Sequence, residues 1–218
     1  METANQFSNR SINLESTSSQ QSNPMMKLLQ ENAVTLTSSI DSIAKKVENN
    51  SHPVRPRGGG KFNAQIAHAI NLVNAGVDAP VIKISLGGFD THEGQTYRHK
   101  PLLKKLADGV SRLRDELSIT DNWQNTVVIT YSEFGRRAAE NKSNGTDHGT
   151  AAAHFVFGGD INGGFLGEHP DLGNLQNNDL QFTMDYRALY SSVLSDWLQL
   201  PDNAFDQYSN NSLSNLFS

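Results

Sequence analysis

Three short apolar runs along the chain have the length and composition of buried β-strands. They are residues 81–86 (VIKISL), 126–132 (TVVITYS) and 154–159 (HFVFGG). Around them, apolar residues recur at the three- and four-residue spacing of amphipathic helices, in residues 62–76, 101–117 and 185–198. Strands that alternate with amphipathic helices predict an α/β fold, with a mostly parallel sheet flanked by helices on both faces.

The N-terminal part of the chain has a different pattern. Residues 1–23 are rich in Ser, Asn and Gln and hold few large apolar side chains, so we predict a disordered polar tail. Residues 24–51 are predicted to be one long helix or two short ones, because apolar residues fall near helical spacing after a proline suited to a first turn. Residues 52–60 combine prolines with three glycines and are predicted to be a linker. Residues 61–218 would then form the main domain.

Composition and charge narrow the class of ligand. The chain has 218 residues, a formal net charge of −5 and 19% charged residues, with acids and bases interspersed. The sequence contains no basic stripe that would bind nucleic acid and no basic run that would bind an anionic membrane surface, so we predict neither partner. No apolar run approaches the ~20 residues needed to cross a bilayer, and the N-terminus lacks the layout of a signal peptide. Because the chain has no cysteine, a metal ion must be held by oxygen and nitrogen ligands.

Acids and histidines stand where the predicted strands end. Asp90 and His92 follow the first strand, Glu133 follows the second, and Asp147 and His148 lie in the loop before the third. In open α/β sheets, ligands bind beyond the carboxyl ends of the strands, so these side chains are predicted to converge. Carboxylate and imidazole together suit Zn or Mn, whereas Mg or Ca is favoured if oxygen ligands dominate.

Simpler interpretations exist for each of these residues. An acid such as Asp90 or Asp147 often forms a helix cap or an Asx turn, and loop histidines are mostly solvated. Arg136 and Arg137 fit a solvated helix start or a pairing with Glu133. The functional interpretation, which is stronger for Arg136 than for Arg137, is a guanidinium fork that orients a phosphate or sulfate. Neither a phosphate loop GxxxxGK[ST] nor a serine hydrolase elbow GxSxG occurs.

Five motifs resemble one known family. They are GGFDTHEGQ, TYSEFGRRAAEN, GTDHGTAAAHFVFGG, INGGFLGEHP and TMDYRALYSSVLSDWL. In this order, between Phe62 and Leu200, they are similar to the C-terminal half of the DUF1501 family. The resemblance implies an alkaline phosphatase-like (sulfatase-like) fold. It also implies one or two divalent metal ions around a Ser, Thr or modified Cys nucleophile that attacks an anionic phosphate or sulfate ester.

The resemblance also implies roles for the residues singled out above. Asp90 and His92 match the first metal motif, Glu133 matches the acid at a strand end, and His148 matches the histidine before the last core strand. Asp147 is its neighbour and a further candidate ligand. The metal set implied is thus Asp90, His92, Glu133, Asp147 and His148.

One departure from the family pattern changes the expected function. The superfamily's nucleophile and a further metal-binding Asp come from an N-terminal strand with a GGxDG-type segment, and GGGKFN at residues 58–63 lacks the acid. Full-length relatives also resemble proteins exported to the periplasm. We therefore expect the metal-binding C-terminal part of a hydrolase, inactive alone, which pairs with an N-terminal half or with itself. The alternative is a non-catalytic relative that acts as a binding or assembly module.

Overall fold

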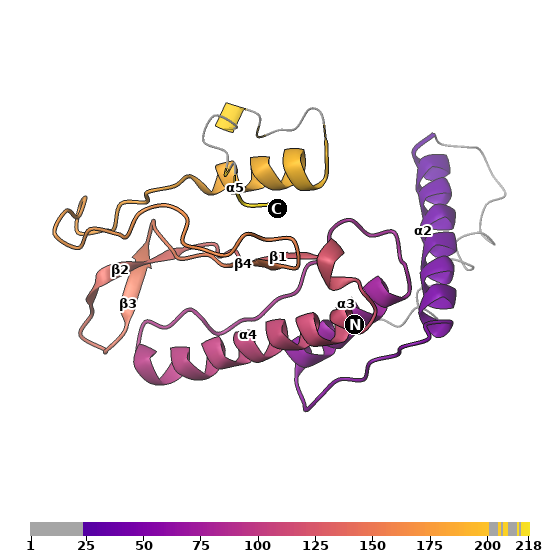
Figure 1. Cartoon of the computed structure of the whole chain (residues 1–218), viewed down its shortest axis with the longest axis horizontal. Helices are drawn as coiled ribbons and strands as arrows, with labels where there is room; N and C mark the ends of the chain where they lie inside the picture. The colour runs from indigo at the N-terminus through magenta and orange to yellow at the C-terminus, as the bar shows by residue number, and fades with distance from the viewer. Residues whose placement is uncertain (1–23, 201–204, 206, 209–212, 214) are drawn as a thin grey trace. The chain divides into compact units, whose positions relative to one another are not determined.

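The computed structural model describes residues 24–200, 205, 207–208, 213 and 215–218 (Figure 1). The tail predicted at residues 1–23 lies outside the described residues. The chain divides into two compact units, Met1–Ile84 and Ser85–Ser218. This boundary comes later in the sequence than the linker predicted at residues 52–60, so the first unit includes the helix that follows that linker.

Among the described residues, the first unit contains two helices, α2 (Pro24–Glu48) and α3 (Lys61–Asn74). The segment expected to be helical therefore forms one long helix, α2, in which none of the described residues is buried. Helix α3 buries one apolar face, made of Phe62, Ile66, Ala67, Ala69 and Ile70. It ends before Gly76, whose positive φ of 62° is a backbone conformation that favours glycine.

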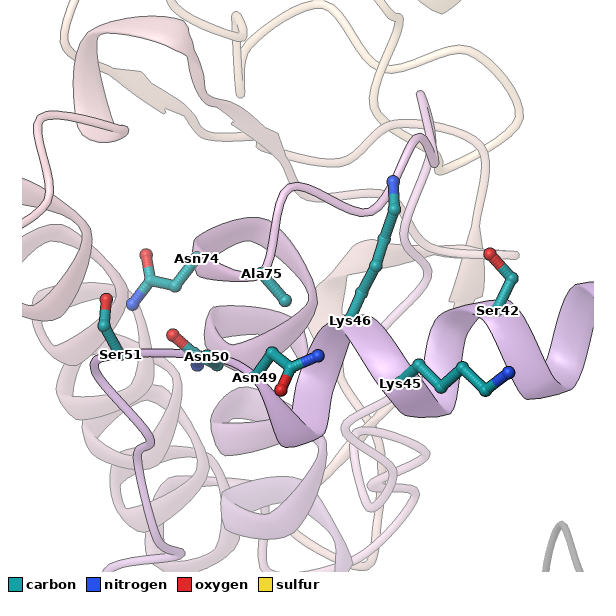
Figure 2. A pocket seen from close by; sticks show the side chains of 8 residues that line it. All are labelled: Ser42, Lys45, Lys46, Asn49, Asn50, Ser51, Asn74 and Ala75. Atoms are coloured by element: carbon teal, nitrogen blue, oxygen red, sulfur yellow. The ribbon is translucent and has the colours of Figure 1, made fainter.

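The connection between these helices is held by α3. The Asn71 side chain accepts a hydrogen bond of 2.7 Å from Val54 N and donates one of 2.9 Å to Val54 O. A polar pocket of about 390 Å³ lies beside the end of α2, lined in part by Lys45, Lys46 and Asn49 (Figure 2). Lys46 Nζ donates to Gly76 O at 2.8 Å. None of the predicted metal ligands lines this pocket.

The described part of the second unit holds two pairs of antiparallel strands. Strand β1 (Val127–Ile129) pairs with β4 (Val156–Gly158), with Val128 opposite Phe157. Strands β2 (Gly135–Glu140) and β3 (Thr146–Gly149) form a hairpin. Two of the three predicted strands thus coincide with β1 and β4, but they run antiparallel. The described part of the chain contains no parallel pair, and the mostly parallel sheet stays a prediction.

The strand predicted at residues 81–86 is not seen. These residues are assigned to no strand, and exposed positions alternate with half-buried ones along them. Val81 is 77% exposed, and Lys83 and Ser85 are also exposed. The interpretation of VIKISL as a buried strand was wrong because its alternate positions include a charged and a polar side chain, which remain in water.

Two α-helices also belong to the described residues of the second unit. Helix α4 (Gln95–Ser118) leads through a 3-10 turn, Trp123–Asn125, into β1. Helix α5 (Tyr186–Ser192) continues into a π-helical turn, Val193–Trp197. In Figure 1 the β1–β4 pair lies between α4 and α5. The buried side chains of this unit include Leu113 and Leu117 on α4, Ala188 and Leu189 on α5, and Leu216.

Candidate metal centre

The first part of the site is the loop that precedes α4. Asp90 and His92 flank Thr91, which is fully buried, while both flanking side chains are exposed. Alternation of this kind is typical of extended chain, in which residues i and i+2 share one side. The buried Thr91 therefore anchors the loop, and the Asp90 carboxylate and the His92 imidazole lie together on its exposed side.

The second part is the β2–β3 hairpin, which docks on this loop. Gly94 N donates to Ser143 O at 3.0 Å, and Gln95 N donates to Asn144 O at 2.9 Å. The Asn141 side chain adds a hydrogen bond of 2.9 Å to His92 O. These bonds hold the turn of the hairpin against the loop. Asp147 and His148, on β3, therefore lie next to Asp90 and His92.

Three predicted ligands meet where the loop and hairpin join. The ligand atoms of Asp90, His92 and His148 all lie within 4.8 Å of one another. His148 Nε2 is 2.8 Å and His92 Nε2 is 3.0 Å from Asp90 Oδ1. One carboxylate oxygen and two imidazole nitrogens form a donor set that fits a zinc-like divalent ion. No other group of three or more such side chains occurs in the described part of the chain.

Asp147 lies behind this group of three. Its Oδ1 atom is 3.2 Å from His92 Nδ1, the ring nitrogen that does not face Asp90. The Asn141 side chain also donates to Asp147 Oδ1, at 3.3 Å. A carboxylate on the far nitrogen of a histidine orients the ring and fixes its tautomer. Asp147, which we expected to be a ligand, is therefore placed to support His92.

Hydrogen bonds favour the ionised form of both carboxylates. The pKa of Asp90 is lowered from its ordinary value of 3.8, first by the hydrogen bond from His148 and also by that from Arg136. The pKa of Asp147 is lowered first by Asn141 and then by His92. Both groups are therefore charged at neutral pH, the state in which a carboxylate binds or supports a metal ion.

Glu133 is the predicted ligand that the structure does not bring to the site. Its side chain is exposed, and it is not part of the group formed by Asp90, His92 and His148. Position at the end of a strand therefore does not by itself bring an acid into the group.

Two residues at the site were not singled out from the sequence. Phe134 stacks on the His148 ring, with centroids 4.0 Å apart and planes 6° apart. Asn141 joins the hairpin to the loop, as described above. The segment Ser143–Gly145 contains Asn-Gly, a turn signal that predicts a hairpin here. An ideal two-residue turn would not have placed Arg136 opposite His148, because the register shifts between Arg136 and Glu140.

Arg136 is engaged with protein groups, not with solvent. Its Nη1 atom donates to Thr146 O at 2.5 Å, and Nη2 donates to Phe89 O at 2.7 Å and to Asp90 Oδ1 at 3.1 Å. The side chain is only 15% exposed. The neighbouring Arg137 is exposed, and its Nε atom lies 3.4 Å from His148 O. The expected free guanidinium fork is thus not present at Arg136.

Comparisons with known proteins identify one family. Searches of curated proteins and of solved structures returned no match. Among the described residues, no helix is both long and apolar enough to cross a membrane. A model of a family of proteins of unknown function matches residues 2–206, which also covers the N-terminal part that carried none of the five motifs. The chain therefore belongs to the DUF1501 family.

Proposed function

We propose that this chain supplies the metal-binding part of a metal-dependent phosphoric or sulfuric ester hydrolase of the alkaline phosphatase-like type. The observation that carries the proposal is the meeting of Asp90, His92 and His148, whose ligand atoms lie within 4.8 Å of one another. Asp90 and His148 are 58 positions apart in the sequence, so a local turn does not explain their proximity. Two imidazoles and one carboxylate favour Zn or Mn over Mg or Ca.

Each residue of the site has a definite part in this proposal. Asp90, His92 and His148 would hold the ion, which when bound supplies Lewis-acid stabilisation of an ester oxygen. Asp147 accepts a hydrogen bond from His92 Nδ1, which leaves Nε2 as the nitrogen for the ion. Three protein ligands leave coordination positions for water or an anionic ester. We assign no nucleophile in this chain, and we expect no ester hydrolysis by the chain alone.

Metal titration of single variants tests the proposal. Isothermal titration of the apo-protein with zinc or manganese should give one site, and Asp90→Ala or His148→Ala should weaken binding at least about 10-fold, because each removes one of three ligands. Glu133→Ala is the matched control, since it removes an exposed acid from outside the group and should leave the affinity unchanged. An equal loss in the Glu133 variant would refute this assignment of the site.

A second candidate function is a non-catalytic binding or assembly module. The observation that favours it is the pairing of site residues with each other: Asp90 with His148, and His92 with Asp147. Such an exposed network is also stable without an ion. If the folded wild-type protein binds neither zinc nor manganese, the second candidate replaces the first.

A further inference from the structure

The least exposed charged side chain of the site belongs to Arg136. It is 15% exposed, whereas Asp90, which it contacts, is 59% exposed. Its guanidinium reaches three acceptors in two segments: Phe89 O and the Asp90 carboxylate in the loop, and Thr146 O in β3. One side chain therefore ties together the two segments that carry the proposed ligands.

The same contacts determine the orientation of Asp90. Arg136 Nη2, His148 Nε2 and His92 Nε2 all approach one oxygen of this carboxylate, Oδ1. Hydrogen bonds between a guanidinium and a carboxylate are charge-assisted and stronger than neutral ones. Removing the guanidinium would take one of three hydrogen-bonding partners from Asp90 Oδ1 and would leave the backbone oxygens of Phe89 and Thr146 without this donor.

The guanidinium is poorly placed to bind a substrate anion. Both of its terminal nitrogens already donate to protein oxygens, and Nε is buried with no hydrogen-bond partner among the described residues. Its central carbon lies 4.8 Å from the centroid of the Phe134 ring, and Phe134 in turn stacks on His148. Three of its five N–H groups donate to protein oxygens and a fourth, on Nε, is buried. A phosphate or sulfate that took two N–H groups would therefore have to break at least one bond that holds the loop to the hairpin.

We infer that Arg136 is a positioning residue of the metal centre, which sets the orientation of Asp90 and the approach of His148, and that it does not bind the anion. The inference rests on the proposed function, because it concerns the same site. It assigns to Arg136 a role that the sequence pattern did not suggest, since a guanidinium beside a phosphoesterase-like site is usually interpreted as an anion fork.

The test compares Co²⁺ binding by variants of the full chain, followed by visible absorption as well as by calorimetry. Arg136→Met keeps the length of the stem and removes the guanidinium. We expect it to weaken Co²⁺ binding by about 10–100-fold, the range typical of residues that orient ligands. It should also change the absorption spectrum of bound Co²⁺, which reports the number and geometry of ligands. A general loss of stability would not change that spectrum at a temperature where the variant is fully folded.

Two further variants make the comparison specific. Arg136→Lys keeps the charge but cannot reach three acceptors at once, so it should restore only part of the affinity. Arg114→Met, on an exposed arginine of α4 that pairs with Asp115, is the matched control and should change the affinity less than 2-fold. If Arg136→Met does not fold, Arg136→Lys carries the test, and wild-type affinity and spectrum in that variant would overturn the inference.

The outcomes separate this inference from the proposed function. Wild-type Co²⁺ binding that is unchanged in Arg136→Met would overturn the positioning role while leaving the metal site intact. Unchanged Co²⁺ binding together with weaker binding of inorganic phosphate to the Co²⁺-loaded variant would show that Arg136 is the anion fork after all. Absence of Co²⁺ binding by the wild-type chain would overturn the proposed function, and the inference with it.

Discussion

The hydrogen side chain of Gly145 allows the turn of the hairpin to touch the backbone of His92. A Cβ atom at this position would stand 2.2 Å from the His92 carbonyl carbon and 2.6 Å from Glu93 N. These are backbone atoms, which cannot rotate away as the end of a side chain can. Glycine is therefore required here by close approach, and the geometry of the site depends on it.

Gly145→Ala should destabilise the protein by about 1–3 kcal/mol, the usual cost of forcing an extra group into a packed contact. It should also weaken metal binding, because the hairpin must move away from His92. Urea unfolding and zinc titration measure the two effects. Gly163→Ala is the control: a Cβ there would meet nothing within 4 Å. Equal behaviour of the two variants would mean that the turn does not rest on His92.

The sequence was sufficient to select the residues that meet but not to assign their roles. Asp90, His92 and His148 were chosen because carboxylate and imidazole recur at the ends of apolar runs, and the structure brings them together. The hydrogen bond between Asp147 and His92, and those from Arg136 to the loop and β3, depend on which atoms face each other across the hairpin. Such cross-strand contacts depend on the pairing register, and this hairpin has an irregularity between Arg136 and Glu140 that a turn signal does not predict.

Among the elements, helix α5 shows how one residue sets where a helix begins. Asp185 accepts a hydrogen bond of 3.0 Å from Arg187 N as the N-cap, and its carboxylate also pairs with the Arg187 guanidinium. The hydrogen bonds from the Arg187 side chain are the main cause of the lowered pKa of Asp185. The charged form of the cap is therefore the one that stabilises the folded state.

Replacing Asp185 by Asn should lower stability in a way that depends on pH. Asparagine keeps the cap but loses the charge that pairs with Arg187. Because the pKa of Asp185 is lower in the folded state, its contribution is complete above the ordinary value of 3.8 and is lost as the pH falls through the folded-state pKa. Urea midpoints of wild type and Asp185→Asn should differ at pH 7 and converge below pH 3.8. The exposed Asp78→Asn serves as a control, and a constant difference at all pH values would contradict the argument.

Helical periodicity predicted the elements of this chain better than apolar runs did. The helices expected at residues 62–76, 101–117 and 185–198 overlap α3, α4 and α5. Helix α4 starts six residues before Pro101, which we took as a start, although a proline inside a helix removes one backbone hydrogen bond. An apolar run indicates only that a segment is partly buried in the protein. It does not give the pairing partner or direction, so the antiparallel arrangement of β1 and β4 was missed.

At the scale of the molecule, the proposed site lies wholly in one of the two units. Its residues all fall within Ser85–Ser218. Both tryptophans, Trp123 and Trp197, lie in the same unit, so intrinsic fluorescence reports on the unit that would bind metal. A ligand that binds only the folded state stabilises it by an amount set by its concentration relative to the dissociation constant.

Zinc at about 100 times its dissociation constant should therefore raise the free energy of unfolding by about 2.7 kcal/mol. The measurement is urea unfolding followed by tryptophan fluorescence, with and without EDTA. Asp90→Ala, with affinity at least about 10-fold weaker, should reduce the increase to about 1.4 kcal/mol or less, while Glu133→Ala should retain it. Stabilisation of the same size in both variants would place the ion elsewhere in the chain.

The sequence distance between the two halves of the site has a consequence for folding kinetics. An ion held by Asp90 and His148 closes a loop across 58 positions, which includes α4 and most of the hairpin. Closing so long a loop is entropically costly in the unfolded chain, so the ion should bind after the hairpin has docked, late on the folding path. Contacts absent from the transition state act on the unfolding rate. Zinc should thus lower the unfolding arm of a chevron plot and leave the folding arm unchanged. The ion would then slow the unfolding of the native chain without guiding its folding.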